Sequence, residues 1–133
     1  MGREILIDTS AIFSLLCPDD INHKNAEAVL KRLKDERLVP LITNFIVAEA
    51  YALLMKRLGG YAARVWLTNN RWSVERIIDN DEMRARKILF KHTDKDYSYT
   101  DATSFAVMER LGIEAAFTFD RHFVQYGFEV LPG

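Results

Sequence analysis

The sequence predicts an α/β domain built on a mainly parallel sheet. Short apolar segments with the length of buried strands alternate with longer segments in which apolar residues recur at helical spacing. Strands that alternate with helices pair in parallel, because each helix carries the chain back to the starting edge of the sheet. A chain of 133 residues can bury about two thirds of the surface of its unfolded form, so we expect residues 1–133 to be a single domain.

The N-terminal half is predicted to contain two strands and four helices. Pro40 is expected at a sheet edge or at the start of its strand, because proline has no N–H for the strand ladder. Asn44 can cap the long helix that follows, and Gly59 with Gly60 ends it. In chain order the segments are strand Arg3–Ile7, a helix from Thr9 or Ser10 to about Leu16, helix Ile21–Glu36, strand Leu38–Thr43, helix Asn44–Leu58 and helix Tyr61–Thr68.

The C-terminal half is predicted to contain two helices and two strands, with one segment undecided. Trp72–Ile78 fits either a strand or the segment that leads into the next helix. Gly112 is expected to end the second helix. In chain order the other segments are helix Asp79–Lys91, helix Ser98–Leu111, strand Ala115–Phe119 and strand Phe128–Leu131.

Composition excludes several classes of protein. The hydrophobic fraction of 49% and the charged fraction of 28% are not those of a disordered, fibrous or disulfide-framed chain. The single Cys17 cannot form an internal disulfide, which favours a reducing compartment. The first ten residues contain Glu4 and Asp8 rather than a signal-peptide core, and no segment approaches the roughly 20 apolar residues of a membrane span. We therefore expect a cytoplasmic protein with no membrane association.

Charge is distributed unevenly along the chain, although the net charge is only −1. Lys56–Lys91 holds nine basic residues and four acidic ones, whereas the remainder holds nine and fifteen. This pattern fits a basic surface that binds nucleic acid, but charge counts alone favour solvated helix faces. The charge distribution alone does not decide between the two interpretations.

Two aspartates are predicted to meet at the carboxyl edge of the sheet. Asp8 directly follows the first strand, and Asp120 directly follows the predicted strand Ala115–Phe119. The carboxyl ends of parallel strands share one edge, where open α/β sheets bind their ligands. Each aspartate taken alone also fits a helix cap. Together they predict a crevice with two carboxylates.

Glu49 is predicted to lie on an apolar helix face. Its neighbours three and four residues away are Phe45, Ile46, Ala52 and Leu53. An ionised carboxylate on such a face costs several kcal/mol unless it is compensated. We expect Glu49 to be protonated, to pair with a base or to coordinate a cation. A favourable interaction with the helix dipole would explain only a surface glutamate.

Asp101 and Asp96 are further candidates near the start of a helix. Ser98 and Asp101 fit the capping-box pattern, so Asp101 is either a structural residue of the first turn or a member of the acidic site. Asp96 fits an outer member of the same group, or with Asp94 a solvated turn. Both interpretations stay open for each residue.

Carboxylates accompanied by the hydroxyls of Thr9, Ser10 and Thr118 predict an oxygen-ligand site for a hard cation. Mg²⁺ or Mn²⁺ fits this ligand set, whereas zinc usually needs cysteine and histidine ligands. Three histidines occur without metal-ligand spacing, and we expect them at surface or loop positions. His122 follows Asp120 by two residues and is near enough to approach the crevice.

Four segments resemble, in order and spacing, the PIN domain, and in particular the compact VapC-type toxins. The segments are Asp8-Thr9-Ser10 after the first strand, Asn44–Glu49 at the start of the long helix, YSYTDATSFAVMERLG around Asp101, and AFTFDRHF around Asp120. The resemblance implies a three-layer α/β/α sandwich with a mainly parallel sheet. It also implies an Mg²⁺- or Mn²⁺-dependent endoribonuclease.

The resemblance further implies an acidic quartet at Asp8, Glu49, Asp101 and Asp120. The family's hydroxyl positions correspond to Ser10 or Thr9 and to Thr118. We assign the first three carboxylates to the cation, and the fourth completes the shell or orients the attacking water. Family resemblance also implies a structured RNA substrate such as transfer or ribosomal RNA, a homodimer, and a protein antitoxin that lies across the cleft.

Other functions fit the sequence less well. A phosphoacceptor receiver domain needs adjacent acids after the first strand, and a haloacid-type phosphatase needs an acid at the position of Ser10. A PIN-like scaffold that binds RNA without cutting it, and an RNA-processing nuclease without an antitoxin, remain alternatives.

Overall fold

The computed structural model describes residues 3–133 and arranges five parallel strands in the order β3-β2-β1-β4-β5 within that range. Each strand is joined to the next by at least one helix, which is why every pairing is parallel. The elements are β1 (Glu4–Ile7), α1 (Thr9–Leu16), α2 (His23–Asp35), β2 (Val39–Thr43), α3 (Asn44–Leu58), α4 (Gly60–Asn69), β3 (Ser73–Glu75), α5 (Asp79–Lys91), α6 (Tyr99–Leu111), β4 (Ala115–Phe117), α7 (His122–Tyr126) and β5 (Glu129–Leu131).

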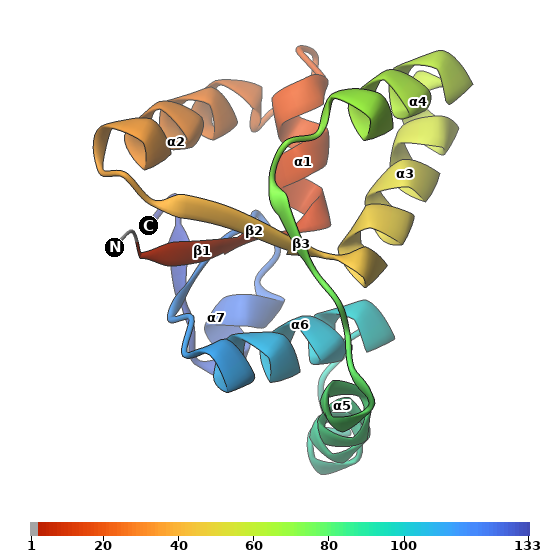
Figure 1. The fold of residues 1–133 in the computed structure, drawn as a ribbon, viewed down its shortest axis with the longest axis vertical. Helices are drawn as coiled ribbons and strands as arrows, with labels where there is room; N and C mark the ends of the chain where they lie inside the picture. Colours follow the sequence, from red (N-terminus) through yellow and green to blue (C-terminus); the bar gives the residue numbers. More distant parts are fainter. Residues whose placement is uncertain (1–2) are drawn as a thin grey trace.

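The helices form two layers with the sheet between them. α1, α2, α3 and α4 cover one face of the sheet, and α5, α6 and α7 lie on the other (Figure 1). Central strand β1 is fully buried at Ile5, Leu6 and Ile7, as expected for a strand covered on both faces. The predicted three-layer α/β/α sandwich with a parallel sheet is therefore confirmed.

The start of α6 lies beside the start of α3. The rings of Phe45 in α3 and Tyr99 in α6 have centroids 6.1 Å apart. Helix α6 also packs against α5 and α7, and its residues from Asp101 to Met108 are all buried. These contacts bring the first turn of α6 to the carboxyl edge of the sheet, where α1 and α3 also begin.

Strand β4 is shorter than predicted. It ends at Phe117, so Asp120 lies in the turn before α7 and not directly after a strand. The Thr118 side chain explains the difference, because its Oγ1 accepts a hydrogen bond from Asp120 N at 3.0 Å and bends the chain into that turn. Helix α7, which follows this turn, is absent from the sequence prediction.

One local prediction in the N-terminal half is wrong. The cap of α3 is Thr43, whose Oγ1 accepts from Ile46 N at 3.0 Å, and not Asn44. Asn44 instead ties α3 to the segment after β3, since its Oδ1 accepts from Ile77 N at 2.7 Å. Pro40 lies near the start of β2, which is one of its two predicted places and the one open to it in this internal strand.

The undecided segment Trp72–Ile78 contains both predicted structures. Ser73–Glu75 forms the edge strand β3, and the residues after it lead into α5. Most helix limits agree with the prediction within two residues; α2, for example, begins at His23 rather than Ile21. None of the helices within residues 3–133 has the length and apolar character needed to cross a membrane.

Candidate functional site

Asp8 lies at the junction of β1 and α1 and serves as the N-cap of α1. Its Oδ2 accepts hydrogen bonds from Ser10 Oγ at 2.8 Å, from Thr118 Oγ1 at 3.0 Å and from Ser10 N at 3.4 Å. Within residues 3–133, Oδ1 accepts none. The cap predicted as the structural alternative is therefore present, and it leaves one oxygen of the carboxylate available to another ligand.

The carboxyl group of Asp8 is difficult to ionise. Burial raises its pKa from 3.8 to about 6, although the hydrogen bonds from Ser10 and Thr118 oppose this shift. The negative charges of Asp101 and Glu49 raise the pKa further. Asp101 and Glu49 are therefore each close enough to Asp8 for their charges to repel the charge of its carboxylate. A cation among them would relieve both the burial cost and the repulsion.

Asp101 has a structural role and a second contact. It forms a capping box with Ser98, in which Asp101 N donates to Ser98 Oγ and Ser98 N donates to Asp101 Oδ2, both at 3.0 Å. The same Oδ2 lies 2.8 Å from Nδ1 of His122. The capping box thus fixes a buried carboxylate at the start of α6 without using all of its hydrogen-bonding capacity.

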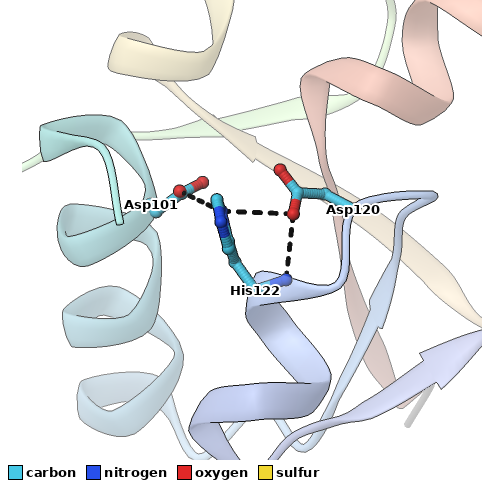
Figure 2. A group of neighbouring side chains, drawn as sticks. All are labelled: Asp101, Asp120 and His122. Atoms are coloured by element: carbon cyan, nitrogen blue, oxygen red, sulfur yellow. Dashed lines mark hydrogen bonds and ion pairs between the residues drawn. The ribbon is translucent and has the colours of Figure 1, made fainter. Parts of the chain in front are cut away.

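His122 joins two of the predicted carboxylates. Its Nδ1 lies between Asp101 on α6 and Asp120 in the turn before α7, at 2.8 Å and 3.1 Å (Figure 2). The backbone N of His122 also donates to Asp120 Oδ1 at 2.9 Å. Its spacing two residues after Asp120 was the available sequence signal. The structure places the His122 side chain against the carboxylates and not at the surface, since it is 16% exposed.

The predicted hydroxyls differ in what they contact. Thr118 donates to Asp8 and accepts from Asp120 N, so it links two carboxylate-bearing segments. Ser10 Oγ donates to Asp8 and accepts from Phe119 N at 3.0 Å. Thr9 Oγ1 is buried without a hydrogen-bond partner within residues 3–133.

The two remaining predicted acids lie in different surroundings. Glu49 is half-buried on α3, one face of which contacts α6, and its charge acts on Asp8. Asp96 is exposed in the segment between α5 and α6. Within residues 3–133, its side chain forms no hydrogen bond with any residue of the site. The structure thus brings Glu49 toward the carboxylates of Asp8, Asp101 and Asp120 and leaves Asp96 outside this group.

The donor atoms suit one divalent cation. Asp101, Asp120 and His122 offer three ligand atoms that lie within 4.8 Å of one another. Asp8 and Glu49 add carboxylate charge, so the set is rich in oxygen and contains no thiolate. Such a set fits Mg²⁺ or Mn²⁺.

Fold and site together define a class of protein: a three-layer α/β/α domain that gathers carboxylates at the carboxyl edge of a parallel sheet. Ligands of open α/β folds bind at this edge. The chain belongs to the PIN domain family, because the family's sequence profile matches residues 5–129.

Relatives of known activity match nearly the whole chain. The 23S rRNA-specific endonuclease VapC20 of Mycobacterium tuberculosis is 35% identical over 133 residues, which cover 96% of this chain and 98% of the relative. The crystal structure of that protein, described as a Sarcin-Ricin loop cleaving toxin, superposes with a TM-score of 0.82 at 34% identity and covers 93% of this chain and 95% of its own.

More distant structures share the fold. A toxin-antitoxin complex from Klebsiella pneumoniae gives a TM-score of 0.70 at 16% identity, covering 97% of this chain and 98% of that one. FitAcB from Neisseria gonorrhoeae gives 0.71 at 20% identity, covering 95% of each chain. At these identities the similarity establishes the α/β/α architecture alone.

Proposed function

We propose that this PIN domain is an Mg²⁺- or Mn²⁺-dependent endoribonuclease that cleaves 23S ribosomal RNA as the toxin of a toxin-antitoxin pair. The observation that carries the proposal is the 35% identity to a 23S rRNA-specific endonuclease over 96% of the chain. The acids gathered at the sheet edge supply a chemical reason for the activity. We treat residues 1–133 as one PIN domain.

We assign the cation to Asp8, Glu49 and Asp101, with Asp120 completing the shell or orienting the attacking water. When bound, a divalent ion polarises the phosphodiester and offsets negative charge on the leaving oxygen. Asp8 is held for this role by Ser10 and Thr118, which fix its Oδ2. The repulsion of the Asp8 carboxylate by Glu49 and Asp101 supports the assignment, because a cation beside ionised Asp8 would offset it.

The charge distribution supports an RNA substrate. An acidic crevice without a cation repels a polyanion, so RNA must be held by positive charge elsewhere. Exposed basic side chains in Lys56–Lys91 are suited to the phosphates on either side of the cut. The proposed substrate places the activity in the cytoplasm.

An antitoxin and a second copy of the chain are proposed as partners. The family resemblance implies both, and one of the solved structures that share the fold is a toxin-antitoxin complex. A protein antitoxin would keep the nuclease inactive until it is removed. An RNA-processing nuclease without an antitoxin, or a non-cleaving scaffold, is the alternative that an assay must exclude.

The test is cleavage of ribosomes by the full-length protein. Ribosomes and total RNA are incubated with Mg²⁺, with Mn²⁺ or with EDTA, and cut ends are mapped by primer extension. We expect a discrete cut in 23S rRNA that EDTA and Asp8→Asn abolish. Asp96→Asn is the matched control, because this exposed acid lies outside the group. Equal cleavage by wild type and Asp8→Asn would contradict the assignment, and no cleavage by wild type would contradict the activity.

A further inference from the structure

Within residues 3–133, His122 is the one histidine that contacts the carboxylates of the site. Its imidazole nitrogen Nδ1 is shared between Asp101 Oδ2 and Asp120 Oδ1 (Figure 2). The side chain is 16% exposed, against 9% for Asp101 and 34% for Asp120. The imidazole therefore lies inside the group of carboxylates and not at its rim.

The position of the imidazole is fixed by its surroundings. The His122 ring packs edge-on against Tyr97, with centroids 5.4 Å apart and an interplanar angle of 82°. Its backbone N donates to Asp120 Oδ1, while Asp120 N donates to Thr118 Oγ1. These contacts hold Nδ1 toward the carboxylates before any ligand arrives. Side chains that coordinate a metal are typically held in position by surrounding contacts of this kind.

The separations match those between neighbouring ligands of one ion. In an octahedral shell with bonds of about 2.0–2.1 Å, adjacent ligand atoms are about 2.9 Å apart. His122 Nδ1 lies 2.8 Å from Asp101 Oδ2 and 3.1 Å from Asp120 Oδ1. The two nitrogen–oxygen separations thus fit adjacent positions of such a shell, with the nitrogen next to both oxygens.

We infer that Nδ1 of His122 is a direct ligand of the divalent ion and that it makes the centre prefer Mn²⁺ to Mg²⁺. The inference rests on the proposed metal-dependent function. Imidazole is a better ligand for transition metals than for Mg²⁺, which selects oxygen. Coordination uses the Nδ1 lone pair of the neutral imidazole with the ring proton on Nε2; a ring that starts with its proton on Nδ1 exchanges it to Nε2 through solvent, and a doubly protonated ring releases one proton to solvent.

The test is metal binding by the purified full-length chain after removal of bound metal. Mn²⁺ and Mg²⁺ affinities are measured by calorimetry, and the Mn²⁺ complex is examined by pulsed electron paramagnetic resonance for a directly coordinated nitrogen. The variants are His122→Asn and His122→Gln. His92→Asn is the control, because this histidine also packs against Tyr97 but contacts none of the site carboxylates within residues 3–133.

We expect the nitrogen signal in wild type and His92→Asn and its loss in both His122 variants. Mn²⁺ affinity should fall about tenfold or more in those variants, with a smaller loss for Mg²⁺. Circular dichroism melts confirm that the variants are folded. The ligand role would be overturned if Mn²⁺ bound to wild type showed no coordinated nitrogen. It would also be overturned if folded His122 variants retained the nitrogen signal. If such a protein still cut ribosomes, the nuclease proposal would stand.

Discussion

Thr118 Oγ1 donates a 3.0 Å hydrogen bond to Asp8 Oδ2 and joins residues that are far apart in the sequence. The same hydroxyl accepts a hydrogen bond from Asp120 N. One buried side chain therefore positions the carboxylate after β1 and the turn before α7. It also lowers the pKa of Asp8, in opposition to burial. The hydroxyl thus favours the ionised form of Asp8 that a cation requires.

Thr118→Val should impair the site more than the fold. The substitution keeps the shape of the side chain but removes the donor to Asp8 and the acceptor for Asp120 N. We expect a stability loss of about 1–3 kcal/mol and a fall of at least about tenfold in ribosome cleavage. The acid limb of the pH–rate profile should move to higher pH, because the hydrogen bond that lowers the pKa of Asp8 is lost. Thr118→Ser should retain the wild-type profile, and an equal loss in both variants would contradict the argument.

Asp8→Asn should stabilise the metal-free protein at neutral pH. The pKa of Asp8 is about 6 in the folded protein against 3.8 for an unperturbed aspartate, so wild type loses stability as the pH rises from about 4 to about 6. The full cost, about 3 kcal/mol, is present above that range. Asparagine can still cap α1 and does not ionise. Chemical denaturation in EDTA should show the largest gain at pH 7.5 and none near pH 4. Parallel pH dependences for the two proteins would contradict the raised pKa.

The fold was predictable because its signals are local and repeated. The apolar strand Ile5–Ile7 and the capping pattern at Ser98 are read directly from neighbouring residues. Asp8 and Asp120 were placed at one edge by the rule for parallel strands, which needs no distances. The presence of Thr118 and Glu49 near this edge was likewise proposed from strand order and side-chain polarity.

The missed features depend on contacts between distant segments. Asn44 looks like a helix cap from its neighbours, yet it bonds Ile77 after β3, and Thr43 takes the cap. Helix α7 is one short turn that packs Phe123 against Phe105, and so few residues give no helical periodicity. The place of His122 follows from that turn. The spacing of two residues between Asp120 and His122 indicated that His122 could reach the site, but the sequence did not decide whether it does.

A divalent ion should stabilise the protein through the carboxylates that the structure groups. Ligands that bind only the folded state add RT ln(1 + [L]/Kd), about 2.7 kcal/mol at a hundredfold excess over Kd. We expect Mn²⁺ to raise the Tm of wild type by several degrees in differential scanning fluorimetry. Asp101→Asn and Glu49→Gln should reduce the rise, and Asp96→Asn should preserve it because Asp96 is exposed outside the group. A rise that is equal in all four proteins would show that Mn²⁺ binds elsewhere.

Arg110 should be necessary for stability and dispensable for cleavage. Its Nε and Nη2 donate to Asp81 at 2.9 Å and 3.0 Å, and Nη2 also donates to Glu75 at 3.1 Å, so the end of α6 is tied to α5 and β3. Asp81 is 2% exposed, and Arg110→Met would leave its charge buried and unpaired, which costs about 3–5 kcal/mol. Urea denaturation should show this loss.

Two further variants distinguish the cost of leaving a buried charge unpaired from the cost of losing an ion pair at the surface. Arg84→Met removes a partly exposed pair with Glu109 at 3.0 Å and should cost less than about 1 kcal/mol. Combining Arg110→Met with Asp81→Asn removes the unpaired charge while the amide oxygen can still accept from Ile78 N, so the double variant should be more stable than Arg110→Met alone. Arg110 lies at the far end of α6 from Asp101, so ribosome cleavage below the Tm should stay within about twofold of wild type. If Arg110→Met and Arg84→Met lowered the free energy of unfolding equally, the burial of Asp81 would not explain why its ion pair is needed for stability.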